Sequence, residues 1–369
     1  MKVLVTGANG FVGQNLLVRL KEEEIGLLTF LRSDSNEVLE QKINNCDFIV
    51  HLAGVNRPKN ESEFAEGNTD LTKRITSVLD ELSLKTPVIY SSSIQAELDN
   101  PYGLSKKFAE DALNQLSKTN GNSVYNYRLP NVFGKWCKPN YNSAVATFCY
   151  NTINNLPINI NDPEAVINLV YIDDVVNEFI NVIKCFSKGE PVINAEVNPV
   201  YNITVGDLVK QLVAFKESKS THIIERVGTD LTRALYSTYI SYFKPKQFSY
   251  GLTKHEDPRG VFVEMLKTKD SGQFSFFSAH PGITRGGHYH HTKNEKFLVI
   301  KGKAKFGFRH IVTDEYYELF TSGDEPQVVE TVPGWSHDIT NIGDDEMFVM
   351  LWANEIFDPE NPDTIYHKV

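Results

Sequence analysis

The sequence has few cysteines, and no two of them are spaced as a CxxC pair. This spacing argues against a zinc ribbon and against a redox motif of the thioredoxin type. We expect reduced, partly buried thiols, as in cytosolic proteins, at the four positions Cys46, Cys137, Cys149 and Cys185.

Long apolar runs are also missing. No stretch approaches the roughly 18 apolar residues that would span a bilayer, and the first ten residues, MKVLVTGANG, lack the apolar core and cleavage site of a signal peptide. The formal charge is -10 without a cluster of basic residues, whereas nucleic-acid binding needs clustered cations. We therefore expect a soluble, cytoplasmic protein with no membrane insertion and no nucleic-acid partner.

The sequence does indicate two folded domains. Hydrophobic residues make up 41% and charged residues 23% of its 369 residues, as in a globular chain too long for one ordinary core. The pattern of apolar residues changes near Phe243–Thr253, where two lysines flank a proline. We predict one domain over residues 1–245 and a second over residues 246–369.

In the first domain, short apolar runs alternate with amphipathic stretches. This alternation predicts an α/β fold, a Rossmann-type doubly wound parallel sheet. The predicted strands are Val3–Thr6, Leu27–Leu31, Phe48–Leu52, Val88–Ser91 and Ser123–Tyr127, and the predicted helices are Val12–Glu24, Asp70–Leu84 and Tyr102–Lys118.

In the second domain, β-branched and aromatic runs are separated by Gly, Pro and Asp. This pattern predicts an all-β sandwich or barrel. The predicted strands are Gly260–Lys267, Gly272–Ala279, Lys296–Ile300, Ala304–Arg309, Gln327–Val332 and Glu346–Trp352.

The segment GANGFVG, residues 7–13, follows the first predicted strand and opens the first predicted helix. Glycines allow a tight turn and a close approach of the backbone to a pyrophosphate, which the helix N-terminus then binds. The pattern predicts a dinucleotide site at Gly7, Asn9, Gly10, Phe11, Val12 and Gly13.

The second predicted strand leads into Arg32 and Ser33, where folds that prefer NAD usually carry an acidic residue for the ribose hydroxyl. A guanidinium and a hydroxyl suit a 2′-phosphate better, so we expect NADPH as the cofactor. Asp34, one residue later, keeps NAD open as the alternative.

Tyr102 and Lys106 lie four residues apart, on one face of a predicted helix. A lysine beside a phenol lowers the pKa of the phenol, which can then exchange a proton with a substrate carbonyl. Ser93, at the end of Ser91–Ser93, can hydrogen-bond the same oxygen.

These motifs together resemble the extended short-chain dehydrogenase/reductases that act on nucleotide sugars. The resemblance runs through GANGFVG (7–13), DFIVHLAG (47–54), YSSS (90–93), YGLSK (102–106), YRLPNVFG (127–134) and LVYIDDVV (169–176). It implies that Tyr102 is the acid/base and that Lys106 binds the nicotinamide ribose. Ser93, with Ser92 as its nearest competitor, would polarise the substrate carbonyl.

The same resemblance implies that Leu52, Ala53 and Gly54 line the cofactor and that Asn131 touches the sugar nucleotide. Relatives that act as 4,6-dehydratases carry Asp-Glu directly after the catalytic hydroxyl residue. Here Ile94-Gln95 follow, and neither side chain can move protons. Dehydration is therefore disfavoured, whereas reduction of a keto sugar and 4-epimerisation remain.

The segment 282–302 carries the most specific pattern in the chain. His288 and His290 stand two residues apart, so on a strand they face the same side. Glu295 adds a carboxylate, and His337 can complete the set. Three imidazoles and one carboxylate suit zinc or another first-row divalent metal. The alternative is a set of polar residues at a barrel mouth without metal.

This segment resembles the cupin signature GX5HXHX4EX6G, which it matches without a gap, whereas the second cupin motif matches less well. The resemblance implies a cupin jelly-roll barrel. Residues Asp257–Phe262 and Arg285–Tyr289 also resemble the dTDP-4-dehydrorhamnose 3,5-epimerases. In those enzymes the histidine that matches His288 is the base that removes a proton beside the 4-keto group.

The two resemblances give His288 different roles, because a metal-bound imidazole has no free lone pair. Our hypothesis is that His290, Glu295 and His337 form the metal core. His288 is then either a fourth ligand or the base. Nearby alternatives for proton transfer are Lys296, Tyr289 and His291.

The two halves in this order resemble the bifunctional capsular polysaccharide enzymes of the UDP-N-acetyl-L-fucosamine pathway. The resemblance implies a homodimer that acts on a UDP-2-acetamido-2,6-dideoxy-hexos-4-ulose. The cupin domain would epimerise C3, and the first domain would then reduce C4 with NADPH to UDP-2-acetamido-2,6-dideoxy-L-talose. Epimerisation must come first, because the ketone acidifies the C3 proton.

Three other interpretations remain open. The β domain can be a non-catalytic sugar-binding or dimerisation module of a keto-sugar reductase. It can instead be an oxygenase, since the same ligand set holds Fe(II). The first domain can also be a 4-epimerase that retains its nucleotide.

Overall fold

Five parallel strands form the sheet at the start of the chain, in the order β2-β1-β3-β4-β5. The central strand β3 is buried along its whole length, as expected of a parallel strand covered on both faces. The strands are β1 (Lys2–Thr6), β2 (Gly26–Phe30), β3 (Phe48–His51), β4 (Val88–Ser93) and β5 (Val124–Leu129).

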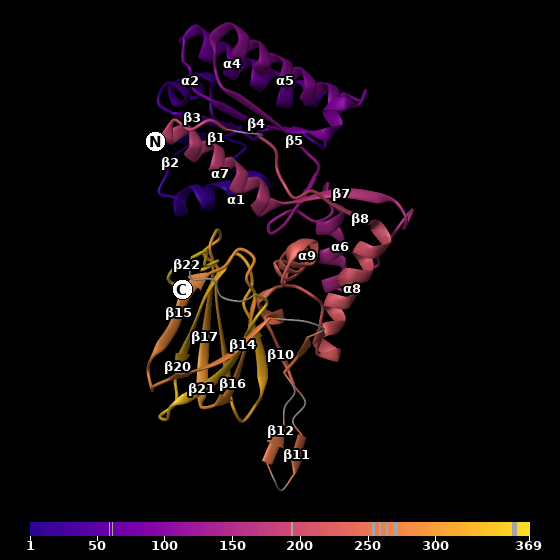
Figure 1. The fold of residues 1–369 in the computed structure, drawn as a ribbon, viewed down its shortest axis with the longest axis vertical. Coiled ribbons are helices and arrows are strands. Elements are labelled where there is room, and N and C mark those ends of the chain that lie inside the picture. Colours follow the sequence, from indigo (N-terminus) through magenta and orange to yellow (C-terminus); the bar gives the residue numbers. More distant parts are fainter. Residues whose placement is uncertain are drawn as a thin grey trace. The chain divides into compact units, whose positions relative to one another are not determined.

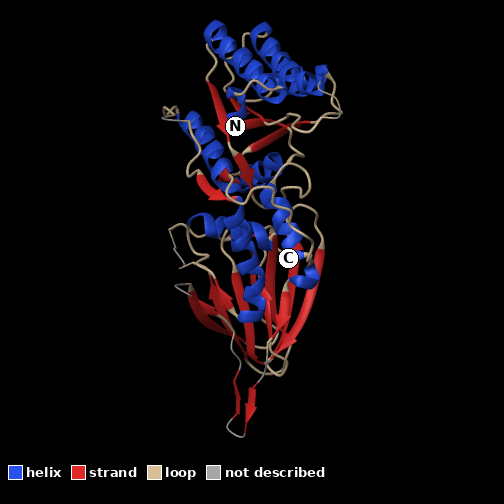
Figure 2. Cartoon of the chain, turned by 90° about the vertical axis from the view of Figure 1, so that its right-hand side faces the viewer, coloured by secondary structure: helices blue, strands red, loops and turns tan. Residues whose placement is uncertain are grey.

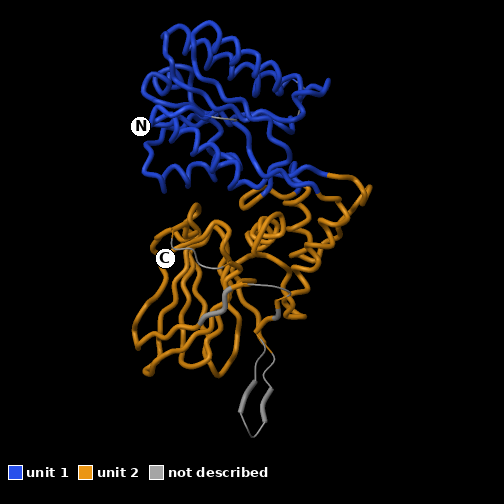
Figure 3. The backbone as a smooth tube through the Cα atoms, viewed as in Figure 1, with its two compact units in different colours: residues 1–133, 140–143, 167–202 blue, residues 134–139, 144–166, 203–369 orange. Residues whose placement is uncertain are grey.

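This computed structural model describes residues 1–58, 60, 62–192, 195–252, 255–257, 260–262, 265–268, 272–355 and 360–369. Of the predicted segments, Thr253 at the predicted boundary, Pro258 and Arg259 of the epimerase-like motif, and residues 263–264 lie outside these ranges. The chain forms two compact units (Figure 3). Unit 1 comprises residues 1–133, 140–143 and 167–202, and unit 2 comprises residues 134–139, 144–166 and 203–369.

Helices cover both faces of the parallel sheet (Figure 1), which confirms the predicted Rossmann-like arrangement. α1 packs with α7, whereas α2, α4 and α5 form the other layer. Leu4, Ile49 and Leu113 belong to the core beneath this second layer. The helices are α1 (Phe11–Glu22), α2 (Asn36–Asn44), α3 (Ser62–Phe64), α4 (Leu71–Glu81), α5 (Pro101–Asn120) and α7 (Ile172–Lys188), with a π-helical turn η1 (Ala65–Asp70) and a 3₁₀ turn η2 (Ile94–Glu97).

A three-stranded sheet follows in the order β6-β7-β8. Its strands are β6 (Asn131–Phe133), β7 (Val166–Tyr171) and β8 (Tyr201–Thr204).

Unit 2 contains two five-stranded antiparallel sheets (Figures 1 and 2). Their orders are β10-β19-β16-β21-β14 and β18-β17-β20-β15-β22, so the predicted all-β character is confirmed. The rings of Phe297 and Phe306, one from each sheet, lie 5.6 Å apart and are both buried. The strands are β10 (Ser249–Gly251), β14 (Gln273–Ala279), β15 (Thr284–Tyr289), β16 (Glu295–Lys301), β17 (Lys303–His310), β18 (Tyr316–Ser322), β19 (Gln327–Glu330), β20 (Trp335–Asn341), β21 (Met347–Ala353) and β22 (Ile365–Tyr366).

Three helices that precede residue 246 cluster with these antiparallel sheets. Phe215 on α8 packs against Tyr236 and Tyr239 on α9, with ring centroids 5.1 and 5.8 Å apart. The compact units therefore interleave along the chain, and the domain boundary at residues 245/246 stays a prediction. The remaining elements are α6 (Ala144–Ile153), α8 (Val205–Thr221), α9 (Asp230–Ile240), η3 (Pro245–Gln247), a parallel pair of β9 (Ile223–Ile224) with β13 (Lys267–Thr268), and an antiparallel pair of β11 (His255–Asp257) with β12 (Gly260–Phe262).

Within the described ranges, no helix is both long enough and apolar enough to cross a membrane. The four cysteines are free thiols, and Cys137 and Cys149 are buried.

Candidate functional site

The glycine turn between β1 and α1 is shaped by close backbone contacts. Gly7 has a φ of +68°, and a Cβ on it would lie 2.6 Å from the backbone nitrogen of Ala53. A Cβ on Gly13 would lie 2.8 Å from the Cα of Ala8. Only glycine fits these two positions, and the turn therefore packs tightly against the residues that follow β3.

The N-terminus of α1 is open to an anion. Its cap residue, Gly10, has no side chain, and neither a side-chain cap nor an acidic first-turn residue occurs among these described residues. Main-chain N–H groups and the helix dipole therefore favour a phosphate at this end. Together with the glycine cradle at Gly7, this arrangement fits the pyrophosphate of a dinucleotide.

The predicted cofactor residues after β3 lie beside the predicted ribose-binding lysine. A Cβ on Gly54 would lie 3.2 Å from Lys106 Nζ and 2.6 Å from Asn68 Oδ1. Asn68 in turn accepts from the backbone N–H of Val55 at 2.8 Å and donates to Ser105 Oγ at 2.9 Å. The sequence reasoning missed Asn68. This residue lies in the π-helical turn η1, which has no recognisable pattern of apolar residues in the sequence.

Tyr102 and Ser93 come together as the sequence predicted. Asn100 caps α5 by accepting from Gly103 N at 2.8 Å, and this cap places Tyr102 in the first turn of the helix. The Ser93 side chain lies close enough to the Tyr102 hydroxyl to lower its pKa. Ser92, the competitor, instead donates from its hydroxyl to the buried carboxylate of Glu110.

One electrostatic expectation is wrong. The pKa of Tyr102 is raised rather than lowered, because burial outweighs the opposing effect of Ser93. Lys106 directs its ammonium group to the backbone carbonyl of Ser91 at 2.9 Å. Burial lowers the pKa of Lys106 to about 8, and the nearby charge of Glu110 partly opposes this change.

Glu110 is a second residue that the sequence reasoning missed. It lies one helical turn beyond Lys106, is buried, and accepts hydrogen bonds from Arg128 Nε at 3.0 Å and Arg128 Nη2 at 2.7 Å. Arg128 also donates to the exposed Glu97 at 3.0 Å. The i, i+4, i+8 spacing of Tyr102, Lys106 and Glu110 was the available signal.

At the end of β2, Arg32 and Ser33 are exposed and Asp34 is not free. Its carboxylate accepts from Lys42 Nζ at 2.6 Å and from the backbone N–H of Leu31 at 3.1 Å. The pKa of Asp34 is lowered, chiefly by the hydrogen bond from Lys42. Asn131 lies at the start of β6, where its amide donates to the carbonyl of Asn168 at 3.1 Å.

The four predicted metal ligands gather in unit 2. His288, His290, Glu295 and His337 each present one ligand atom, and these atoms all lie within 4.8 Å of one another. His290, Glu295 and His337 are buried, whereas His288 is half-buried. The strands explain the arrangement, since β15 pairs with β20 so that His288 stands opposite His337.

A bulge directs His288 into this cluster. The register of β15 against β20 shifts between Gly286 and His288, and Gly286 and Gly287 have φ values of +103° and +78°. Glycine tolerates these angles, whereas other residues rarely adopt them. The pair Gly286-Gly287 therefore re-aims the strand directly before the histidine.

The charges in the cluster fit a bound cation. Burial opposes ionisation of Glu295, but contacts with His290 and His337 outweigh it and hold the pKa of the carboxyl well below its usual range. His290 Nδ1 donates to the backbone carbonyl of Asp363, so its neutral ring carries a lone pair on Nε2. That nitrogen lies 3.2 Å from Glu295 Oε2. Two acceptors at this distance need a proton or a metal ion between them.

His337 gives a second test of this fit. Both of its ring nitrogens are buried without a hydrogen bond to the described residues, although Nε2 lies 3.4 Å from Glu295 Oε2. An unpaired buried nitrogen is costly unless a ligand uses its lone pair. Imidazole and carboxylate donors are those that zinc and similar divalent metals prefer. The four residues therefore fit a divalent metal.

The three alternative proton-transfer residues make contacts outside the four-residue cluster. Lys296 is buried and forms an ion pair with Glu330, because it projects from the opposite face of β16 to Glu295. The ring of Tyr289 packs against His291 and His367, with centroids 5.6 and 5.9 Å apart.

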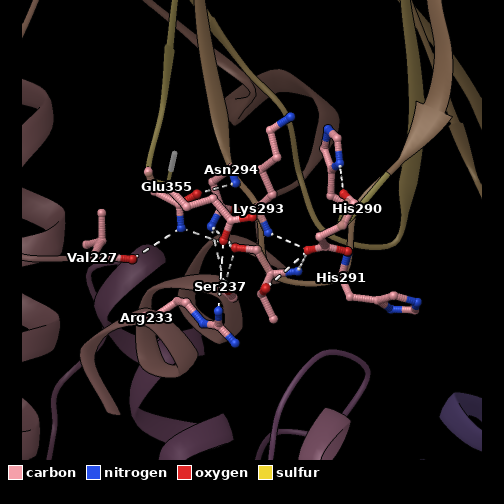
Figure 4. Close-up of polar contacts among 11 residues, drawn as sticks. Val227, Arg233, Ser237, His290, His291, Lys293, Asn294 and Glu355 are labelled. Carbon is pink, nitrogen blue, oxygen red and sulfur yellow. Dashed lines mark hydrogen bonds and ion pairs between the residues drawn. The ribbon is translucent and has the colours of Figure 1, made fainter. Parts of the chain in front are cut away.

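The loop that joins His290 to Glu295 is held by polar contacts from several elements (Figure 4). Asn294 donates to Ser237 Oγ on α9 at 3.3 Å and to the carbonyl of Thr292 at 2.8 Å. The carboxylate of Asp363 accepts from three backbone N–H groups of this loop. Asp363 lies far along the chain in an irregular tail, so no sequence pattern pointed to it.

Comparison with known proteins assigns the chain to a family. The model of the NAD dependent epimerase/dehydratase family matches residues 3–203, and that of the Polysaccharide biosynthesis C-terminal domain matches residues 255–365. A UDP-2-acetamido-2,6-beta-L-arabino-hexul-4-ose reductase from Pseudomonas aeruginosa is 57% identical over 365 residues, which cover 99% of this chain and 98% of that protein. The chain belongs to the NAD dependent epimerase/dehydratase family. A nicotinamide cofactor follows from this membership.

Solved structures support the same relationship over both units. The crystal structure of the capsular polysaccharide assembling protein CapF from Staphylococcus aureus is 44% identical, with a TM-score of 0.68 and full coverage of both chains. A structure of CapF with the inhibitor 3-isopropenyl-tropolone is 40% identical, with a TM-score of 0.63 and the same coverage. The predicted resemblance to capsular polysaccharide enzymes is confirmed.

Proposed function

We propose that this protein is a bifunctional UDP-sugar enzyme that epimerises C3 of a UDP-2-acetamido-2,6-dideoxy-hexos-4-ulose and then reduces its C4 ketone with NADPH. The product would be UDP-2-acetamido-2,6-dideoxy-L-talose, an intermediate for capsular polysaccharide. The observation that carries the proposal is the presence of two separate groups of candidate catalytic residues in one chain. One set is Ser93, Tyr102 and Lys106, and the other is the four-residue His/Glu cluster.

The reductase assignment is supported by the relative from Pseudomonas aeruginosa, whose name describes reduction of a UDP-linked hexul-4-ose. In unit 1, Tyr102 would donate the proton to the C4 oxygen while Ser93 hydrogen-bonds the same oxygen. Lys106 would hold the nicotinamide ribose beside Gly54. When bound, NADPH supplies the hydride. Asn131 would contact the sugar nucleotide.

The cofactor preference is proposed from the end of β2. Asp34 is already neutralised by Lys42, so its carboxylate is engaged within the protein. The exposed guanidinium of Arg32 and hydroxyl of Ser33 are left to bind a 2′-phosphate. This arrangement favours NADPH over NADH.

The epimerase assignment is proposed from the cluster in unit 2, whose antiparallel sheets we take to be a cupin jelly roll. His290, Glu295 and His337 are buried and would hold a divalent metal, most simply zinc. His288 is the half-buried member, so it is the one that can reach a substrate, and we assign it as the base that removes the C3 proton. When bound, the metal supplies positive charge that stabilises developing negative charge on the substrate.

The test uses the 4-keto substrate in D2O with the full-length protein. NMR follows loss of the C3 proton signal before NADPH is added, and absorbance at the nicotinamide band follows oxidation afterwards. We expect exchange first and NADPH oxidation second. NADPH oxidation by a chain that never exchanges C3 would contradict the epimerase assignment.

Two variants make the test specific. His288→Gln should lose C3 exchange while it keeps the bound metal, and Tyr102→Phe should lose reduction by about 10²- to 10⁴-fold while it keeps exchange. Tyr90→Phe is the matched control, because the buried Tyr90 hydroxyl has no hydrogen-bond partner among the described residues. Retained exchange in His288→Gln would show that another group is the base.

A second candidate is a keto-sugar reductase whose β domain only binds sugar or forms a dimer. The name of the relative from Pseudomonas aeruginosa, which mentions reduction alone, favours it. Chelation of the metal separates the two candidates. Loss of C3 exchange, restored by Zn²⁺, supports the bifunctional enzyme, whereas unchanged product formation supports the reductase. The homodimer and the cytoplasmic location stay predictions, and sedimentation of the purified protein tests the former.

A further inference from the structure

We propose that Asp363, in the tail that follows the last long strand, is a positioning residue for the metal centre. It would hold the loop between the ligands His290 and Glu295 and set the orientation of the His290 ring. This inference rests on the metal-dependent function proposed above. It concerns a residue outside the four-residue cluster.

The carboxylate of Asp363 fixes the loop through its main chain. It accepts from the backbone N–H groups of His291, Thr292 and Lys293 at 2.9, 2.6 and 2.7 Å, and from Thr292 Oγ1 at 3.1 Å. Hydrogen bonds to an ionised acceptor are stronger than neutral ones. Three consecutive N–H groups bound to one carboxylate leave the loop little freedom to change the spacing of His290 and Glu295.

The backbone of the same residue orients the ligand itself. The carbonyl oxygen of Asp363 accepts from His290 Nδ1. A carbonyl cannot donate, so this contact fixes the proton on Nδ1 and leaves Nε2 free to bind a metal. Asp363 therefore acts on both the position and the tautomer of one ligand.

The tail that carries Asp363 is anchored beside the other ligands. β22 pairs with β15, the strand of His288. His367 N donates to the carbonyl of Gly287 at 2.9 Å, and the Ser336 hydroxyl, next to His337, donates to the carbonyl of His367 at 2.5 Å. The contacts of the tail thus reach the elements that carry His288 and His337, in addition to His290 itself.

A separate set of contacts holds the other side of the loop. Asn354 Oδ1 accepts from the backbone N–H of Asn294 at 2.9 Å, and Ser237 Oγ donates to the carbonyl of Thr292 at 3.1 Å (Figure 4). Neither contact involves Asp363. Replacement of Asp363 is therefore expected to loosen the ligand geometry while the loop stays docked on α9 and on Asn354, which follows β21.

The experiment measures metal binding rather than turnover. Full-length wild type, Asp363→Ala and Asp363→Asn are stripped of metal and titrated with Co²⁺, whose visible spectrum reports coordination geometry. We expect about 10- to 100-fold weaker binding for Asp363→Ala, with an altered spectrum, and a smaller loss for Asp363→Asn. Tyr366→Ala is the control, because its side chain is 82% exposed and its backbone pairing is unaffected.

The outcomes separate this inference from the proposed function. Wild-type affinity and spectrum in Asp363→Ala would overturn the role of the Asp363 carboxylate and leave the metal-dependent epimerase standing. A wild-type chain that binds no Co²⁺ would overturn both. Thermal unfolding of the metal-free proteins shows whether Asp363→Ala is folded. If it is not, Asp363→Asn decides the matter, and unchanged affinity there overturns the inference.

Discussion

The ammonium nitrogen of Lys106 lies 2.9 Å from the carbonyl oxygen of Ser91, so this buried lysine joins α5 to the end of β4. The same nitrogen lies 5.0 Å from the centre of the Tyr90 ring. These contacts fix the lysine where a Cβ on Gly54 would touch it. Its charge state is therefore set by this local environment.

Reduction should depend on the pH in a defined direction. Burial lowers the pKa of Lys106 to about 8, so the group is charged below that pH and neutral above it. If the charge holds the cofactor, kcat/KM for NADPH-dependent reduction should fall as the pH rises through about 8. A pH profile from 6 to 10 tests this, and a flat profile would contradict the role of the charge.

Glu110 should determine the pH at which kcat/KM for reduction falls. Its negative charge raises the pKa of Lys106, so Glu110→Gln should move the fall to lower pH. Glu97→Gln is the matched control, because Glu97 and Glu110 both pair with Arg128 but Glu97 is exposed. Equal profiles for the two variants would show that Glu110 does not act on Lys106.

Two glycines with positive φ should respond differently to alanine. Gly7 and Gly121 have φ values of +68° and +78°, so both substitutions should cost about 1 kcal/mol of backbone strain. A Cβ on Gly7 would also meet the backbone of Ala53 at 2.6 Å, whereas the space around Gly121 is open apart from Lys85 Nζ at 4.0 Å. We expect Gly7→Ala alone to weaken NADPH binding, as measured by fluorescence titration. Similar losses of NADPH affinity in both variants would contradict a specific role for the close contact between Gly7 and Ala53.

Arg32 should decide the choice of nicotinamide cofactor. Hydrogen bonds to charged groups contribute about 1.5–3 kcal/mol, which corresponds to about 10- to 100-fold in affinity. Arg32→Ala should raise the KM for NADPH by this factor and leave the KM for NADH nearly unchanged. Steady-state kinetics with both cofactors test the prediction, and an equal change in both KM values would point to a general rather than a phosphate-specific contact.

The buried carboxylate of Glu330 should contribute more to stability than the ammonium group of Lys296. Glu330 forms an ion pair with Lys296 and lies 3.2 Å from Lys219 Nζ. Glu330→Gln leaves two ammonium groups without their carboxylate and should cost about 3–5 kcal/mol. Lys296→Met should cost less, because Glu330 keeps Lys219. Scanning calorimetry gives the order of the unfolding temperatures, and the reverse order would contradict this account.

Local patterns in the sequence were enough for much of the site. GANGFVG predicted the turn at Gly7, because strand, turn and helix follow one another directly. The i, i+4 spacing placed Tyr102 and Lys106 on one face of α5, and the alternation of His288 and His290 brought them together. These features depend on neighbours within a few residues.

Features that depend on distant contacts were not predictable. Asp363 acts from the tail on a loop at residues 291–293, and nothing near it in the sequence shows this. The pKa of Tyr102 was predicted in the wrong direction, because burial is a property of the folded chain. The choice of Ser93 over Ser92 likewise depended on the carboxylate of Glu110, which lies on another element.

The interleaving of the two units has a consequence for biosynthesis. The strands of the parallel sheet are complete once Leu129 has been made, so the sheet can begin to fold while the ribosome continues, before α7 joins α1 on one of its faces. The buried face of α6 belongs to unit 2, and its packing partners α8 and α9 are translated later. The partner of Trp136 is translated even later. The centroid of its ring lies 6.0 Å from that of His310, which belongs to β17. Unit 2 therefore cannot fold segment by segment as it is translated. Its earliest apolar segments must stay soluble until the antiparallel strands have left the ribosome.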